Sequence, residues 1–292
     1  MKSALQKSPI PKTHAFVVEE LRQSIFDPNW HFHPEYQLFM VIKGTGTRFI
    51  GDHVKSFQAG DITLLGPNLP HLWRSDNIET INAGGNGAEG IVVYFNENFI
   101  GDELLNKEEG ILLRQLFRKS LRGFDITGAA VKEISQRISN LPKLEGFDAV
   151  LGLMHILNLL SQTSNIKSIA SSGYTNTLRE GDTERMNRVY AYVMKHFQRK
   201  ISIGELAKLT NMTPTSFSRY FKTHSNKTFS EFVSEIRIGH ACKLLIEKKI
   251  NASRASYESG FRTMSNFNRQ FKAITKTTPL NYKKRYERTK SE

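Results

Sequence analysis

The residues near the start of this sequence that are best suited to bind a ligand are three histidines and a glutamine. His31 and His33 are separated by one residue, Gln37 follows four residues later, and His71 comes further along the chain. Imidazole nitrogens donate or accept hydrogen bonds and also bind metals, whereas an amide forms hydrogen bonds without carrying charge. The group therefore predicts a polar pocket for a small ligand, a metal site, or side chains that only satisfy nearby backbone groups.

A second group lies near the other end, where one pattern of aromatic and basic residues occurs twice. The repeated residues are fifty positions apart, so that Phe217, Arg219, Phe221 and Lys222 recur as Phe267, Arg269, Phe271 and Lys272. Phenylalanines four residues apart share one face of a helix, and the basic residues point elsewhere. Two copies are too few for a solenoid. The pattern predicts two versions of one small unit, each with a basic, polar helix face.

The excess of positive over negative charge lies entirely in the part of the chain that carries this repeat. The net charge of the whole chain is +13. Residues 184–292 contain 23 Lys and Arg against 8 Asp and Glu, a net charge of +15, so the remaining residues carry −2. A basic domain attached to a near-neutral one predicts a polyanion partner for the basic domain alone.

The cysteine content and the apolar runs indicate the compartment. Cys242 is the only cysteine, so a disulfide framework is excluded and a reducing compartment is expected. No apolar run approaches the ~18 residues that span a bilayer. The segment from Met1 to Lys12 is polar and lacks the apolar core of a secretory signal. We therefore expect a cytoplasmic protein without membrane contact.

Short β-strand patterns occupy the first hundred residues. The apolar runs are bounded by Gly, Pro and Asp and cover residues 36–42, 45–50, 62–65 and 90–95. This spacing is typical of a sandwich or barrel, and small barrels hold one small molecule. The sequence predicts a β-barrel over about residues 11–100.

Helical periodicity follows over about residues 101–163. The last of three expected helices is apolar almost all round, so it must be covered on every side. The barrel can cover one side, and either a second subunit or the rest of the same chain covers the other. Residues 164–182 are rich in Ser, Thr, Asn and Gly and predict a flexible linker. Residues 1–163 are therefore expected to form one domain, for effector binding and dimerisation.

Residues 183–292 carry the signals of two helix-turn-helix units in an all-α domain. Ser202 begins a capping box, and Asn211 suits the left-handed turn that follows. Thr213 and Pro214 then begin a second, polar helix of the kind that enters the major groove of DNA. The same order of cap, turn and polar helix recurs about fifty residues later.

The motifs in this region point to one family. They are Ile203-Gly-Glu-Leu-Ala207, Met212-Thr-Pro, Phe-x-Arg-x-Phe-Lys in both units, Gly260-Phe261, and Thr278-Pro279 followed by Tyr282. With these motifs the region closely resembles the DNA-binding domain of the AraC/XylS family of bacterial transcription regulators. The resemblance implies base contacts from Thr215, Ser218, Arg219, Ser265, Asn268 and Arg269, and phosphate contacts from Lys222 and Lys272.

The chemistry of these side chains agrees with the implied roles. Arginine can form two hydrogen bonds with guanine, and asparagine can do the same with adenine. The alternative for Arg219 and Arg269 is a phosphate contact, which positions a protein without reading sequence. The expected partners are double-stranded DNA, a second copy of the chain in a homodimer, and RNA polymerase.

The first domain carries a second resemblance through His31-Phe-His33, Gln37, Gly44, Gly60-Asp61 and Pro67-Asn-Leu-Pro-His71. These residues are similar to the two sequence boxes of cupin barrels, in which three histidines and a glutamate hold a metal. Gln37 occupies the glutamate position, and a neutral amide disfavours a divalent ion because it brings no charge. The expected site therefore has no metal or cofactor and binds a small effector, such as a sugar or related metabolite, through His31, His33, Gln37, His71 and Trp73.

Two further expectations concern function. The expected protein is a transcription regulator, and the alternative is a metal-dependent cupin enzyme fused to a DNA-binding domain. Where the family has two isoleucines and an alanine in the first helix of the second unit, this chain has Ala252, Ala255 and Ser256. The core of this unit loses two branched side chains. We therefore expect it to be looser, and the first unit to read bases more strictly.

Overall fold

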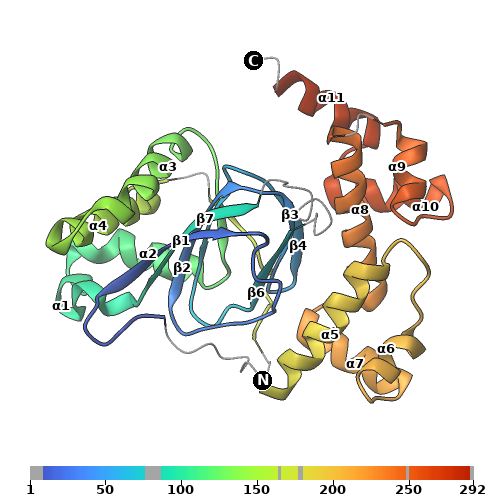
Figure 1. The fold of residues 1–292 in the computed structure, drawn as a ribbon, viewed down its shortest axis with the longest axis horizontal. Helices are drawn as coiled ribbons and strands as arrows, with labels where there is room; N and C mark the ends of the chain where they lie inside the picture. Colours follow the sequence, from blue (N-terminus) through green and yellow to red (C-terminus); the bar gives the residue numbers. More distant parts are fainter. Residues whose placement is uncertain (1–8, 76–86, 164–165, 177–179, 248–249, 290–292) are drawn as a thin grey trace. The chain divides into compact units, whose positions relative to one another are not determined.

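The computed structural model describes residues 9–75, 87–163, 166–176, 180–247 and 250–289. The chain forms two compact units (Figure 1). The second runs from Gly181 to Glu292, and the first accounts for almost all of the preceding residues. No helix among the described residues is long and apolar enough to cross a membrane.

The first unit contains a large and a small β-sheet. The six-stranded sheet has the order β1 (Phe16–Gln23), β7 (Ala88–Phe95), β2 (Tyr36–Lys43), β5 (Ile62–Leu65), β8 (Phe124–Ile126), β9 (Ile166–Ser168). The three-stranded sheet has the order β4 (His53–Phe57), β3 (Gly46–Ile50), β6 (His71–Ser75). The predicted β-domain is confirmed, but closure into a barrel is not detected among the described strands, which form two separate sheets.

Alternation along β2 explains the layers of this unit. Successive side chains of a strand point to opposite faces of the sheet. Leu38 and Met40 lie in one apolar core with helices α2, α3 and α4, whereas Phe39 and Val41 lie in another with Ile50 and other residues of the small sheet. The large sheet is therefore buried on both faces, between helices and the second sheet (Figure 1).

The helices of the first unit follow β7. They are α1 (Asp102–Leu105), α2 (Ile111–Ser120), α3 (Val131–Asn140) and α4 (Gly146–Gln162), with short 3-10 turns at Glu97–Ile100, Glu108–Gly110 and Leu141–Lys143. On the predicted all-round apolar helix, α4, Leu153 and Leu157 are buried against the sheet and its neighbouring helices. Phe147 is 71% exposed and Leu151 is 43% exposed. One apolar face of α4 is thus uncovered within a single chain.

The predicted linker differs from the structure. Residues 166–168 form strand β9, which pairs with β8, and Ile169 and Ala170 are buried between the two sheets. Burial of these two apolar residues stabilises the segment. The sequence does not reveal the strand, because the surrounding residues are mostly polar. Residues 164–165 and 177–179 lie outside the described residues.

The second unit is entirely helical. Its helices are α5 (Glu180–His196), α6 (Ile203–Leu209), α7 (Pro214–Ser225), α8 (Phe229–Glu247), α9 (Ala252–Glu258), α10 (Met264–Thr275) and α11 (Pro279–Thr289). Helix α8 joins the helix pair α6–α7 to the helix pair α9–α10 (Figure 1). Its Phe232 contacts Tyr190 of α5 and Phe221 of α7, while Leu244 and Leu245 pack in one cluster with α9 and α10. Because one helix contributes to both cores, the two pairs are joined by a rigid element.

Candidate functional site

Local capping interactions build the first helix-turn-helix unit. The Ser202 hydroxyl accepts a hydrogen bond from the backbone N–H of Glu205, whose carboxylate in turn accepts from the backbone N–H of Ser202. Asn211 has φ +56° and makes the turn, and the Thr213 hydroxyl then accepts from the Ser216 N–H at 3.2 Å. The predicted cap, turn and second helix are therefore present as α6 and α7.

The second unit is built in the same order with other residues. Asn251 caps α9 by accepting from the Arg254 N–H at 2.8 Å, and Thr263 caps α10. Gly260 makes the turn with φ +86°. A Cβ atom at Gly260 would lie 2.5 Å from the Gln198 carbonyl oxygen. Glycine is required there both by the backbone conformation and by this close approach.

The predicted DNA-contacting residues lie on the open faces of α7 and α10. Phe217 and Phe221 in α7, and Phe267 and Phe271 in α10, are fully buried. All eight predicted residues are exposed and fall at positions i, i+3, i+4 and i+7 of the two helices: Thr215, Ser218, Arg219, Lys222, Ser265, Asn268, Arg269 and Lys272. Such spacing places four residues along one helix face. Each unit thus presents a polar, basic surface opposite its aromatic anchors.

The side chains on these two faces differ in what they already contact. The Ser218 hydroxyl donates to the Pro214 carbonyl oxygen of its own helix at 3.0 Å. The Arg269 guanidinium donates to Asn266 Oδ1 at 3.1 Å. Among the residues that the structure describes, the guanidinium of Arg219 has no hydrogen-bond or ion-pair partner. A guanidinium without a protein partner remains available for an external acceptor.

Helix α8 also holds the connection between α5 and α6. The Arg237 guanidinium donates to the carbonyl oxygens of Phe197 at 2.7 Å and Arg199 at 2.8 Å. The Gln198 side chain donates to the Glu258 carbonyl oxygen of the second unit at 2.9 Å. No residue type in the sequence marks the three carbonyl oxygens to which Arg237 and Gln198 donate. These hydrogen bonds connect the two helix-turn-helix units in addition to the connection made by α8.

The structure brings the predicted histidines and glutamine together in the first unit. Gln37 Oε1 lies 3.0 Å from Nε2 of His33 and 3.0 Å from Nε2 of His71. One ring nitrogen from each of His31, His33 and His71 lies within 4.8 Å of the other two. We call these four side chains the histidine pocket.

Burial sets the protonation state of this pocket. Removal from water lowers the pKa of His71 well below its usual range, with further lowering by His31 and His33. Burial also lowers the pKa of His31, despite the hydrogen bond with the Asn29 carbonyl oxygen. Both imidazoles are therefore neutral near pH 7, because desolvation disfavours the charged form.

Aromatic and acidic side chains enclose the histidine pocket. Trp73 is buried with its ring centroid 5.6 Å from that of His71, and Tyr94 lies 5.2 Å from His33. The Glu35 carboxylate is 1% exposed and its Oε2 lies 3.4 Å from His33 Nδ1. Tyr94 and Glu35 are absent from the predicted set. Glu35 precedes β2, so strand alternation does not show that its side chain points inward.

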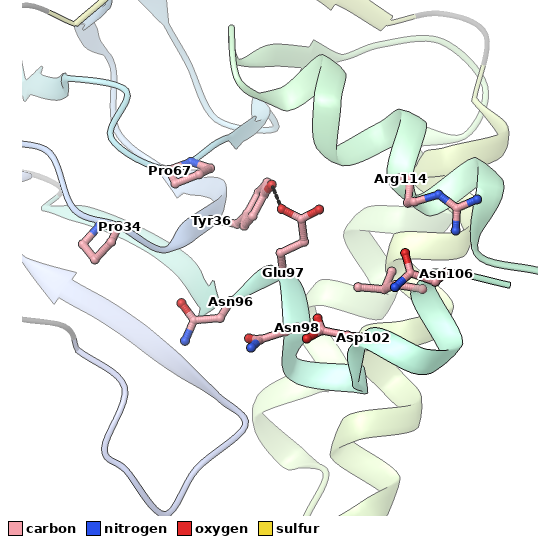
Figure 2. A pocket seen from close by; sticks show the side chains of 10 residues that line it. Pro34, Tyr36, Pro67, Asn96, Glu97, Asn98, Asp102, Asn106 and Arg114 are labelled. Carbon is pink, nitrogen blue, oxygen red and sulfur yellow. Dashed lines mark hydrogen bonds between the residues drawn. The ribbon is translucent and has the colours of Figure 1, made fainter.

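A separate polar pocket of about 390 Å³ lies near the start of β2 (Figure 2). Tyr36 points into it and donates a hydrogen bond to Glu97 at 3.0 Å. The lining residues are Pro34, Tyr36, Pro67, Asn96, Glu97, Asn98, Asp102, Leu105, Asn106 and Arg114. Most of them belong to the segment after β7, whose pattern carries no ligand-binding motif, so the sequence does not predict this pocket.

Two family models match the chain, one in each unit. The AraC-like ligand binding domain matches residues 15–123, and a helix-turn-helix domain matches residues 206–285. The chain is 23% identical over 266 residues to the HTH-type transcriptional regulator YdeC of Bacillus subtilis (strain 168), with 87% of this chain and 85% of that protein covered. It is 27% identical over 88 residues to the HTH-type transcriptional regulator GlxA of Rhizobium meliloti (strain 1021), covering 30% of this chain and 27% of GlxA.

Solved structures give weaker similarities. ToxT from Vibrio cholerae O395 aligns with a TM-score of 0.36 and 16% identity, covering 92% of this chain and 97% of ToxT. The DNA-binding domain of AdpA, solved in complex with a target DNA, aligns with a TM-score of 0.34 and 19% identity, covering 36% of this chain and 94% of that domain.

The two matched domains define a DNA-binding transcription regulator with a ligand-binding domain. More narrowly, the chain belongs to the AraC family of helix-turn-helix transcriptional regulators. The predicted family is thereby confirmed, as is the predicted fold class of an N-terminal β-domain with a C-terminal helical DNA-binding domain. The individual site residues remain predictions.

Proposed function

We propose that this regulator reads a specific DNA sequence with two unequal helices, and that a small effector bound by its first unit controls it. The observation that carries the proposal is the pair of exposed polar faces on α7 and α10, each held by two buried phenylalanines. A helix with this exposure and charge can enter the major groove and contact base edges.

The proposed contacts divide into base contacts and phosphate contacts. Arg219 and Arg269 pair with guanine, and Asn268 pairs with adenine. Thr215, Ser218 and Ser265 line the same faces, and Lys222 and Lys272 at their ends meet phosphates. Phosphate contacts fix the register of the protein on the duplex without reading sequence.

Selection of binding sites from random duplexes, followed by a salt titration, tests the DNA-binding proposal. We expect a defined consensus. We also expect affinity to fall steeply between about 50 and 200 mM salt, because lysine and arginine release counterions from phosphates. A flat salt response, or selected duplexes with no shared sequence, would contradict it.

The proposed effector site is the histidine pocket of His31, His33, Gln37 and His71, which Trp73 also lines. Three of these side chains are at least 96% buried, which favours a ligand of a few atoms over a sugar ring. A sugar or related metabolite suits the polar pocket of Figure 2 better, since its volume falls in the usual range for small-molecule sites.

A thermal-shift screen on the full chain distinguishes the two pockets. A ligand that binds the folded form raises the midpoint of unfolding. His31→Ala should remove the shift caused by a ligand of the histidine pocket, and Asn98→Ala the shift caused by a ligand of the pocket in Figure 2. A shift that both variants retain would place the effector elsewhere.

We further propose that the regulator acts as a homodimer in the cytoplasm and contacts RNA polymerase. The exposed Phe147 and Leu151 on α4 support the dimer, because a second copy would remove this apolar face from water. Sedimentation of the full chain tests this proposal. Phe147→Glu should shift a dimer to a monomer, whereas Glu145→Gln, at the exposed start of the same helix, should leave the dimer intact.

A further inference from the structure

The segment that follows α4 returns to the first unit and extends the pairing of β8 with β9. The backbone N–H of Ile169 donates to the Gly123 carbonyl oxygen at 2.9 Å. The next N–H, that of Ala170, donates to the Arg122 carbonyl oxygen at 2.9 Å, and the Arg122 guanidinium donates to the Ala170 carbonyl oxygen from Nε at 2.9 Å and from Nη2 at 2.6 Å. We call residues 166–176 the strap. Backbone pairing and buried apolar side chains fix its first half, up to Ala170.

Side-chain contacts hold the second half of the strap, residues 171–176. The buried Asp52 carboxylate accepts hydrogen bonds from the backbone N–H of Ser171 at 3.0 Å and from the hydroxyl of the same residue. The Tyr174 ring lies against Gly51, where an added Cβ atom would come within 3.0 Å of a ring carbon. Both contacts are with the turn between β3 and β4. The described residues of this half form no strand, so its docking depends on a few side chains.

The docking surface shares its backbone with the histidine pocket. The Asn176 amide donates to the Asn68 carbonyl oxygen at 3.0 Å. The backbone N–H of Asn68 donates to the His33 carbonyl oxygen at 2.7 Å. The next carbonyl oxygen, that of Leu69, lies 2.7 Å from Nδ1 of His71. One short loop therefore contacts both the strap and two histidines of the pocket.

Docking of the second half is opposed by one buried group. The Tyr174 hydroxyl is inaccessible to solvent and has no hydrogen-bond partner among the described residues. Burial without such a partner costs free energy, because the hydroxyl loses its hydrogen bonds to water. The two halves of the strap thus differ in stability, and the second half can undock by local opening while β9 stays paired.

The chain that leaves the strap enters α5, whose first turn is attached to α7. The Tyr220 hydroxyl donates to the Asp182 carbonyl oxygen at 2.9 Å, and Asp182 Oδ2 lies 3.8 Å from Nε2 of His224. Tyr220 and His224 are four residues apart on the half-buried side of α7, away from its exposed polar face. The start of the second unit is therefore fixed to a helix that is proposed to read DNA.

Undocking of residues 171–176 lengthens the chain between the strap and α5. An extended chain spans at most about 3.3–3.6 Å per residue, so these six residues add about 20 Å to that length. With the strap docked, the shorter chain restricts the positions available to the second unit. Undocking relaxes this restriction, while the helices of the second unit keep their contacts with one another.

We propose that the second half of the strap is a regulatory element that docks on the first unit and leaves it, and that a ligand in the histidine pocket favours the docked form. Such a ligand contacts His33 and His71 and so holds their neighbouring loop in place, and this loop is where Asn176 docks. A ligand shifts such an equilibrium because it binds one form better. The inference rests on the proposed function, because it assigns the regulation of the same effector site.

Amide hydrogen exchange of the full chain, followed by NMR, tests the proposal. The N–H groups of Ala170 and Ser171 are adjacent, but they donate to different partners, a backbone carbonyl oxygen and the Asp52 carboxylate. We expect at least about tenfold less protection at Ser171 than at Ala170, since local opening exposes the second half alone. Equal protection would show that the strap opens as one unit, which would overturn the proposal.

Two substitutions in the strap should act in opposite directions. Ser171→Ala should lower the protection of the amide at position 171 about tenfold or more, because it removes a hydrogen bond to a carboxylate. Tyr174→Phe should raise the same protection at least about threefold, because it removes the buried hydroxyl. Ser168→Ala changes an exposed serine of β9 and is the matched control, which should leave the protection unchanged. Equal protection in Ser171→Ala and Ser168→Ala would contradict the docking.

The same variants test whether docking restricts the second unit. Small-angle X-ray scattering of the full chain should give a larger radius of gyration for Ser171→Ala than for Tyr174→Phe, because undocking lengthens the chain between the two units. An equal radius in the two variants would contradict this role of the strap.

Coupling to the histidine pocket is tested by a substitution outside the strap. His71→Ala removes the ring that holds the docking loop through a backbone carbonyl oxygen. The ratio of protection at Ser171 to that at Ala170 should then fall at least about threefold, whereas His155→Ala, exposed on α4, should leave it unchanged. An unchanged ratio in His71→Ala would overturn the coupling. If this variant does not fold, as judged by circular dichroism, His31→Ala replaces it, since the two rings lie 4.4 Å apart.

Operator binding and its salt dependence are measured on the same samples. Retained, salt-dependent operator binding with no response of the strap overturns this inference alone. A strap that responds as expected in a chain that binds no operator overturns the proposed function alone, because the docking equilibrium belongs to the first unit.

Discussion

The two helix-turn-helix units have helices of equal length but different local chemistry. Helices α6 and α9 each have seven residues, and α7 and α10 each have twelve. The turn between the helices has four residues in the first unit, 210–213, and five in the second, 259–263. The same helix pair is therefore obtained from different turns, because buried phenylalanines at matching positions fix how the second helix packs.

The units also differ where their helices begin and end. The first begins with a reciprocal capping box, whereas Asn251 caps the second with one side-chain bond. Helices α7 and α10 both end on a residue in the left-handed conformation, Asn226 with φ +53° and Lys276 with φ +60°. Asparagine adopts this conformation readily and lysine does not. The stability of the second unit thus depends more on packing against its neighbours than on its helix caps.

The largest expected difference between the units is in DNA affinity. Arg219→Ala should weaken operator binding by ~1–3 kcal/mol, roughly 5–150-fold, because it removes the proposed bidentate base contact. Arg269→Ala should cost less if the second unit reads bases less strictly. Fluorescence anisotropy with a labelled operator measures both, and Arg137→Ala on α3 is the charge-matched control. Equal losses in the two units would show that they read DNA equally strictly.

The next largest expected difference between the units is in how much their N-terminal caps stabilise the first helix. Ser202→Ala should destabilise α6 by about 0.5–2 kcal/mol, since it removes one half of a capping box. Asn251→Ala should destabilise α9 by less, because one bond is lost instead of a reciprocal pair. Amide hydrogen exchange, followed separately for the two helices in the full chain, gives both values. A greater loss of stability in α9 than in α6 would contradict this prediction. The same measurement on the parent chain tests whether the second unit is looser around Ala255.

The left-handed helix ends provide a gain in stability. Lys276→Gly should stabilise the second unit by ~1 kcal/mol, because glycine has no Cβ to clash in this conformation. Asn226→Gly should change the first unit by less, since asparagine already tolerates the geometry. Exchange protection of α10 and α7 measures the two effects. No gain at residue 276 would mean that Lys276 contacts offset its backbone strain.

Acid should affect the first unit through Glu205. Hydrogen bonds from Arg199, then Tyr192 and Ser202, hold the pKa of this carboxyl well below its usual value of 4.5. A carboxyl with a lowered pKa in the folded state contributes stability that is present above pH 4.5 and is lost as the pH falls below that value. Carboxyl-carbon NMR should show Glu205 still charged at pH 4. Protection of α6 should fall on further acidification, and in Glu205→Gln this fall should be absent.

The predictable parts of the structure are those with local signals. Thr213, Pro214 and the phenylalanine pairs mark their helix from residues within one or two turns. A nearly continuous apolar run likewise reveals β2, because both faces of this strand are buried. The four side chains of the histidine pocket are found from residue type and from the resemblance to cupins. In each case the information lies within a few residues or in a known motif.

The remaining features depend on contacts between distant segments. Arg237 meets carbonyl oxygens forty residues away, and a carbonyl is present at every position, so no residue type marks the partner. Strand β9 pairs with β8 about forty residues earlier, although its surroundings are polar. Glu35 points inward because the chain bends before β2, where alternation does not apply. Such pairings become visible only when the fold is known.

The exposed faces of α7 and α10 carry different polar side chains in a fixed order along one chain. Thr215 and Ser218 lie on the first face, where Ser265 and Asn268 lie on the second. A duplex that matches both faces is not equivalent when read from its opposite end. One bound chain therefore has a defined orientation on its DNA site. Inverting the site in a promoter would leave the affinity unchanged, but it would reverse which of the two units lies nearer the start of transcription. Control of transcription in one direction is then available to a single chain, without a palindromic site.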